Sequence, residues 1–203
     1  MINIYRTDNR IISEIDQFDT GAWVKLTAPS LEECAEISDR FHMDIADVRA
    51  ALDDEESSRI NLEDEYTLIL VDIPSAEMRN NRHSYTTIPL GILIAEDVVI
   101  TVCAEETAVL RSFVEQRVRD FSTKKQMRFT YQILYNACMV YQSLLRSIDR
   151  KRTEIEERID QNTEDVDLID LHELESNLVY FATSLRANGV VLDRLTRYGR
   201  LRQ

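Results

Sequence analysis

The two halves of the chain carry different patterns of hydrophobic and polar residues. All three prolines lie within the first 90 residues, and between Gly91 and Gly189 the chain has neither glycine nor proline. Short apolar runs separated by turn residues are typical of strands, whereas a long stretch without glycine or proline favours helices. We therefore predict strands and short helices in the first half and long helices in the second.

In the first half, apolar runs and helix caps predict a sheet with two short helices. Strands are predicted over residues 2–6, 10–15, 22–26, 66–74 and 86–103, the last divided by a turn at residues 96–97. Ser30 followed by Glu33 fits a capping box at the start of a helix, and Asp44 with Asp47 repeats the pattern before a second helix. The near-continuous apolar runs predict central strands that are covered on both faces.

In the second half, apolar residues recur in alternating steps of four and three, which predicts two helices with buried stripes. The first stripe, with nine of ten positions apolar or aromatic, is Met127, Tyr131, Leu134, Cys138, Tyr141, Leu145, Ile148, Arg152, Ile155 and Ile159. The second is Leu171, Leu174, Leu178, Phe181, Leu185, Asn188, Leu192 and Leu195. A helix of roughly 34 residues is about 50 Å long. The short polar connection between the stripes predicts an antiparallel hairpin.

These patterns together predict an α+β fold. A small α/β sheet domain over residues 1–105 is expected to precede a long helical hairpin over residues 106–203. Leu192 and Leu195 still lie on the apolar stripe near the end of the sequence. We therefore expect the hairpin to lead into a stalk helix that is truncated here.

Charge is distributed unevenly along the 203 residues, whose net charge is −13. Residues 1–110 carry 8 Lys/Arg and 23 Asp/Glu, net −15, whereas residues 111–203 carry 16 and 14, net +2. Such acidity repels phosphate backbones, so nucleic-acid binding by the first half is not expected. It favours cations or a basic partner, although plain solubility is an equally good explanation.

Several classes of protein find no support in the sequence. No apolar stretch approaches the roughly 18 residues of a membrane helix, and the amino terminus does not read as a secretory signal. Cys34, Cys103 and Cys138 have no metal-binding spacing, so we predict reduced, buried thiols of a cytosolic chain. Catalytic triads and glycine-rich phosphate loops are not visible, so an enzyme is not expected.

The run "ALDDEESSRI", residues 51–60, places four carboxylates in succession after a predicted short helix. Carboxylates at a helix carboxyl end are unfavourable by about 0.3–1 kcal/mol each, because the helix dipole is negative there. The run lacks the glycine and the alternating spacing of an EF-hand loop. Three interpretations stay open: a solvated turn, a weak Mg²⁺ or Ca²⁺ site within one chain, and a ligand set shared between subunits.

Four segments in this order resemble the CorA-type magnesium transporter family, over nearly all of residues 1–195. They are "AWVKLTAPSLEECAEISDRFHMDIADVRAAL", "RINLEDEYTLILVDIP", "LGILIAEDVVITVC" and "DLHELESNLVYFATSLRANGVVLDRL". Family members continue with a stalk, two membrane helices and a Gly-Met-Asn signature between them. The sequence contains no Gly-Met-Asn.

The resemblance implies a homopentameric funnel whose cytoplasmic domains sense intracellular Mg²⁺ through acidic residues at subunit boundaries. The family's usual regulatory carboxylate falls on Ala50 here, so Asp53, Asp54 and Glu56 become the candidate inter-subunit metal ligands. Co²⁺, Ni²⁺ or Zn²⁺ are further candidates for the transported or regulatory ion. The full-length protein is expected in the cell membrane and this portion in the cytoplasm, monomeric or dimeric in isolation. The alternative is a soluble adaptor whose helical hairpin binds a partner.

Overall fold

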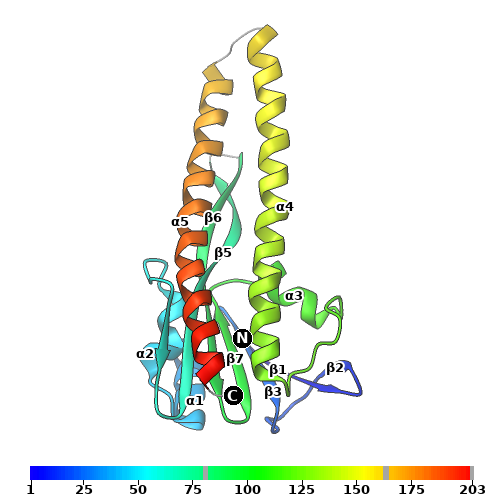
Figure 1. Ribbon diagram of the computed structural model, residues 1–203, viewed down its shortest axis with the longest axis vertical. Coiled ribbons are helices and arrows are strands. Elements are labelled where there is room, and N and C mark those ends of the chain that lie inside the picture. Colours follow the sequence, from blue (N-terminus) through cyan, green and yellow to red (C-terminus); the bar gives the residue numbers. More distant parts are fainter. Residues whose placement is uncertain (80–81, 162–164, 202–203) are drawn as a thin grey trace.

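The computed structural model describes residues 1–79, 82–161 and 165–201, in which a sheet carries a long helical hairpin (Figure 1). The strands are β1 (Ile2–Asp8), β2 (Ile11–Glu14), β3 (Ala22–Thr27), β4 (Arg59–Leu62), β5 (Tyr66–Arg79), β6 (Arg82–Ala95) and β7 (Val98–Cys103). The helices are α1 (Leu31–Phe41), α2 (Ile45–Arg49), the 3₁₀ turn η1 (Ala50–Leu52), α3 (Ala108–Val114), α4 (Gln126–Gln161) and α5 (Asp165–Leu201).

The strands form one mixed sheet in the order β2-β1-β3-β7-β6-β5-β4. The pair β3–β7 is parallel, and the other described pairs are antiparallel. The hairpin turn at residues 96–97 lies where the sequence predicts it, and further turns lie at residues 9–10 and 63–65. The predicted α+β class is therefore confirmed, while the boundary at residues 105–106 stays a prediction.

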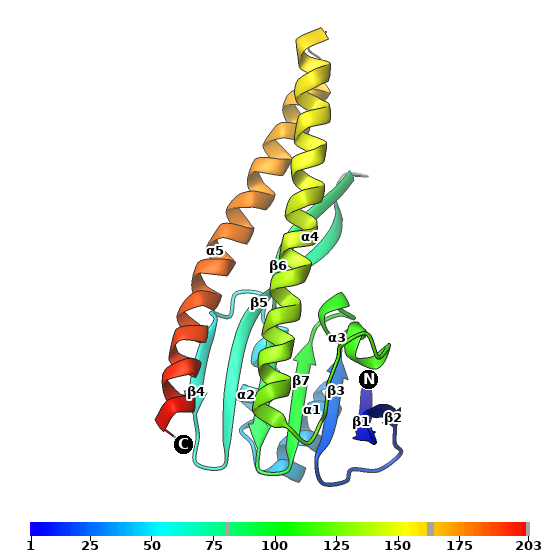
Figure 2. The ribbon, with the colours of Figure 1, turned by 45° about the vertical axis from the view of Figure 1, so that its right-hand side comes forward.

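Helices cover both faces of the sheet, as the apolar character of its central strands predicts (Figure 2). Helices α1, α2 and η1 pack on one face, and α3, α4 and α5 pack on the other. Trp23 is fully buried on the second face, where its indole nitrogen donates a 2.8 Å hydrogen bond to Thr101 Oγ1. The rings of Phe113 and Phe129 lie 6.2 and 5.1 Å from the Trp23 ring, so this aromatic group anchors α3 and α4.

The predicted helix caps are present, with one difference. The Ser30 side chain accepts from the Glu33 N–H and the Glu33 carboxylate accepts from the Ser30 N–H, which completes the capping box. Asp44 caps α2 by accepting from the Ala46 N–H, but Asp47 instead accepts a 2.7 Å hydrogen bond from the Tyr66 hydroxyl. Burial and this carboxylate raise the pKa of Tyr66 to about 12.

Strands β5 and β6 extend beyond the sheet as a two-stranded ribbon that rises beside α4 (Figure 2). The sequence predicts that the first of them ends at Pro74, but pairing continues to Arg79. Strand β4 pairs with β5 only as far as Leu70, and β7 pairs with β6 only from Leu90 onward. Pro74 and Pro89 both lie beyond these limits, at edges where a missing N–H disrupts no ladder.

The antiparallel hairpin of α4 and α5 is confirmed, but the buried stripe of α4 begins on a different face from the predicted one. Phe129, Ile133 and Ala137 are buried against the sheet, while Met127 and Cys138 are exposed. The exposure of Cys138 corrects the prediction that all three thiols are buried. The predicted stripe is right where α4 meets α5, at Tyr141, Ile148 and Ile155.

The inward face of α5 is partly polar, which the apolar stripe does not predict. Its buried residues, at steps of three, four or seven, are Asp167, Leu174, Asn177, Phe181, Ser184, Val191 and Leu195. Of the eight predicted stripe residues, Leu174, Phe181 and Leu195 are buried, whereas Leu178 and Leu192 are 40% and 42% exposed. Among the described residues, no helix is long and apolar enough to cross a membrane.

Candidate metal site and its link to helix α5

The three predicted metal ligands lie in the acidic turn that joins η1 to β4. Asp53 follows η1 directly, and its N–H donates to the Ala50 carbonyl oxygen at 3.3 Å. Asp53 and Asp54 are exposed, and Glu56 is half-buried. The turn thus presents its first two carboxylates to solvent, where a cation or a second chain can reach them.

Two of these carboxylates already have partners in the turn or at the start of β4. Asp53 Oδ1 accepts from the Glu55 N–H at 3.0 Å, and Glu56 Oε1 forms an ion pair with Arg59. No group of three His, Cys, Asp or Glu side chains is arranged to hold a metal ion in residues 1–79, 82–161 and 165–201. Carboxylate oxygens suit a hard cation such as Mg²⁺, but one copy of the described chain does not bring them together.

The buried position of Ala50 does not suit a carboxylate. Ala50 and Ala51 are 6% and 1% exposed and belong to the core between α2 and the sheet. A Cβ added at Gly91 on β6 would lie 3.2 Å from the Ala51 Cβ, so the backbones of η1 and β6 are closely packed. A carboxylate at residue 50 would be desolvated here, which leaves Asp53 and Asp54 as the nearest exposed oxygen ligands.

A polar cluster beneath α5 begins two residues after the acidic turn. Ser58 Oγ lies 3.2 Å from Asn188 Oδ1, which also accepts from the Asp72 N–H at 2.8 Å. Asn188 Nδ2 donates to the Asp72 carbonyl oxygen at 2.7 Å. The side-chain amide of Asn188 therefore satisfies both backbone groups of Asp72, just beyond the last β4–β5 pair.

The Asp72 carboxylate forms the centre of this cluster, which we call the Asp72 cluster (Ser58, Asp72, Thr87, Tyr141, Ser184 and Asn188). Ser184 Oγ lies 2.8 Å from both Asp72 Oδ2 and Thr87 Oγ1. The Tyr141 hydroxyl donates to the Asp72 carbonyl oxygen at 2.9 Å. Burial raises the pKa of Asp72, and hydrogen bonds from Ser184 and Ser58 oppose that rise.

The Asp72 cluster joins the sheet, the helical hairpin and the segment that precedes β4. It contains residues of β5, β6, α4 and α5, together with Ser58, which precedes β4. Sequence reasoning missed it, although a lone Asp inside the apolar run "YTLILVDIP" is a signal that a polar partner faces that strand. The cluster offers a single carboxylate held by hydroxyl and amide groups, so its chemistry is that of a structural contact.

A mixed sheet that carries a long antiparallel helical hairpin defines the fold class of the chain, an α+β domain. The model of the family described as CorA-like Mg²⁺ transporter protein matches residues 18–203, and the chain belongs to this family. The family is one of transporters, in agreement with the resemblance seen in the sequence.

Individual relatives agree with this assignment. The chain is 24% identical over 179 residues to the cobalt/magnesium transport protein CorA of Methanocaldococcus jannaschii, which covers 86% of the chain and 55% of that protein. The chain thus spans about half the length of this curated relative.

Solved structures show the same fold. The soluble domain of CorA from M. jannaschii superposes with a TM-score of 0.81 at 22% identity, over 95% of the chain and 77% of that domain. The cytoplasmic domain of ZntB from Vibrio parahaemolyticus gives a TM-score of 0.55 at 11% identity, over 99% and 98%. At these identities the likeness concerns the fold alone.

Proposed function

We propose that this chain is the cytosolic regulatory and assembly domain of a CorA-like divalent-cation transporter in the cell membrane. In this proposal the complete protein is a homopentamer, and Mg²⁺ is both a transported ion and the regulatory ligand. Asp53 and Asp54 of one copy bind the ion together with oxygen ligands of a neighbouring copy. Facing carboxylates repel one another, and a bridging divalent ion relieves that repulsion and stabilises the assembled, closed state.

The observation that carries the proposal is the match to the family over residues 18–203. Two features of the chain support the regulatory part. Asp53 and Asp54 are exposed and have no cationic partner among the described residues, so their charge is available to a cation. Ser58, four residues further on, contacts Asn188 of α5, so the acidic turn is physically joined to the hairpin.

The test compares two pairs of acidic residues in exposed turns of the same sheet. The complete protein in mild detergent is expected to run as a pentamer in light scattering, with thermal stability that rises with Mg²⁺. The double variant Asp53→Ala/Asp54→Ala should lose this Mg²⁺-dependent stabilisation. The matched control Glu63→Ala/Asp64→Ala removes the same charge from the β4–β5 turn and should keep it.

Different results would reject different parts of the proposal. A monomer or dimer in mild detergent would reject the assembly role. A pentamer whose stability is insensitive to millimolar Mg²⁺ would reject sensing. Equal loss of the Mg²⁺-dependent stabilisation in both double variants would show that it depends on the total charge of the protein and not on the acidic turn.

A second candidate is a soluble adaptor whose hairpin binds a partner, and the outward face of α5 favours it. Apolar side chains are exposed on this helix at Leu178, Val179, Tyr180 and Val190. Mg²⁺-dependent growth of a transport-deficient strain distinguishes the two candidates. Rescue by the complete gene supports the transporter domain, and expression without rescue supports the adaptor.

A further inference from the structure

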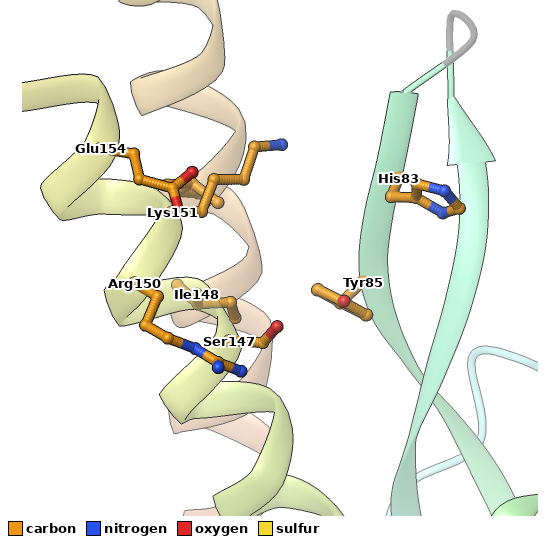
Figure 3. A pocket seen from close by; sticks show the side chains of 8 residues that line it. His83, Tyr85, Ser147, Ile148, Arg150, Lys151 and Glu154 are labelled. Atoms are coloured by element: carbon orange, nitrogen blue, oxygen red, sulfur yellow. The ribbon is translucent and has the colours of Figure 1, made fainter. Parts of the chain in front are cut away.

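A pocket of about 360 Å³ separates the β5–β6 ribbon from the helical hairpin (Figure 3). Its polar lining comes from two elements, β6 and α4: His83, Tyr85, Ser147, Arg150, Lys151 and Glu154. Ile148 of α4 and Leu174 of α5, which are 3% and 4% exposed, complete the lining. The volume lies within the range of about 300–1,000 Å³ that is usual for small-molecule sites.

The cations of this pocket lack partners. Neither Arg150 nor Lys151 has an ion pair or a side-chain hydrogen bond with any residue in the described part of the chain, and only Glu154 opposes them in the lining. Arg152, one residue away, pairs with both Asp149 and Glu156. In a chain of net charge −13, the pocket thus carries two cations whose charge is available to an anion.

The arrangement of side chains matches an anion with an attached apolar body. Figure 3 shows Lys151 reaching from α4 toward the ribbon, Arg150 lying along α4 with its guanidinium near Ser147, and Tyr85 between β6 and the hairpin. Guanidinium and ammonium groups both bind phosphate oxygens well. The Tyr85 ring packs on the core of the hairpin, 6.3 Å from the Phe181 ring, so its position is fixed before any ligand arrives.

We propose that this pocket binds the phosphate of a small molecule, with its oxygens on Arg150 and Lys151 and any organic body against Tyr85 and Ile148. The site is distinct from the acidic turn, and the inference does not rest on the proposed transporter function. A ligand in this pocket bridges α4 and the β5–β6 ribbon. It therefore stabilises the ribbon against the hairpin, in addition to the hydrogen bonds of Ser84 and Tyr85 with Asn177.

The experiment is isothermal titration of the 203-residue chain with ADP and, separately, with inorganic phosphate, in low-salt buffer that contains EDTA. Chelation removes divalent ions, so the result is independent of metal sensing. Saturable binding is expected. In the double variant Arg150→Gln/Lys151→Gln the affinity should fall about tenfold or more, since two charge-assisted contacts are lost. The control Arg152→Gln, on the same helix, should bind as the unaltered chain does.

Each outcome decides the question. The inference is overturned if neither compound binds at about 10 mM, an affinity below 3 kcal/mol, or if binding survives unchanged in the double variant. Tighter binding of ADP than of phosphate supports an organic phosphate seated on Tyr85. Equal affinity of the two supports a free phosphate as the ligand.

Discussion

Replacement of Asn188 by Ala should destabilise the protein more than its half-buried position on a helix would indicate. The Asn188 amide takes the place of a neighbouring strand, because it donates to the Asp72 carbonyl oxygen at 2.7 Å and accepts from the Asp72 N–H at 2.8 Å. It also contacts Ser58 at 3.2 Å. The substitution removes all three contacts at once, without changing the core residues around it.

The magnitude follows from which groups are left without a partner. The Asp72 carbonyl oxygen keeps its 2.9 Å hydrogen bond from the Tyr141 hydroxyl, whereas no other described hydrogen bond reaches the Asp72 N–H. An unsatisfied, partly buried donor costs about 1–3 kcal/mol, and the other contacts add roughly 1 kcal/mol. Alanine regains about 0.6 kcal/mol through its higher helix propensity. The net loss in free energy of unfolding should be about 1.5–3.5 kcal/mol.

Urea unfolding followed by far-ultraviolet circular dichroism measures this loss. The control is Val190→Ala on the same helix, where the side chain is 56% exposed and the change should stay within about 0.5 kcal/mol. If Asn188→Ala unfolds at the same urea concentration as Val190→Ala, the amide does not bind the strand backbone. In that case the hydrogen bonds of Asn188 would not hold α5 on the sheet.

Three further predictions concern other groups in the structure. Burial raises the pKa of Asp72 above its ordinary 3.8, so the stability from this group is complete below pH 4 and is lost as pH rises through the raised pKa. Asp72→Asn should therefore gain stability relative to the unaltered chain as pH increases from 4 to 8, and a constant difference in urea unfolding would contradict this. Phe181→Ala should cost about 3–5 kcal/mol, because Phe181 is 1% exposed and packs edge-on against the Tyr141 ring, while Leu178→Ala should cost little. An aromatic disulfide reagent should label one thiol of the native chain quickly, at the exposed Cys138. Burial raises the pKa of Cys103 to about 11, and rapid labelling of two or more thiols would contradict the described core.

Most of the fold can be predicted from the sequence, because its elements are set by local features. The capping box at Ser30 and the turn at residues 96–97 depend on neighbouring residues alone, and both occur where they are expected. The long hairpin follows from periodicity and from the absence of glycine and proline. The length of β5 could not be predicted, because the tolerance of Pro74 depends on where β4 stops pairing.

The inward face of α5 was harder to predict because apolar periodicity favours leucine at every position. Leu178 and Leu192 fit the apolar stripe, yet Ser184 and Asn177 are the buried residues. Their partners belong to strands at least 90 residues away in sequence, so spacing along the helix carries no information about them. Metal binding by the three carboxylates of the acidic turn stays a prediction for a related reason, since the proposed further ligands lie on another copy of the chain.

The polar contacts of α5 with the sheet determine how a movement of the acidic turn could affect this helix. An apolar helix face can slide over a sheet with small losses, because hydrophobic contact is not directional. The Asn188 amide, in contrast, matches one N–H and one carbonyl group of β5, so a shift of α5 by even one residue breaks both hydrogen bonds. Ser58 belongs to the same set of contacts and lies two residues beyond Glu56. A cation that moves the acidic turn would therefore also act on the position of α5 along β5. Asn188→Ala should weaken any effect of Mg²⁺ on the hairpin, although the carboxylates of Asp53 and Asp54 are unchanged.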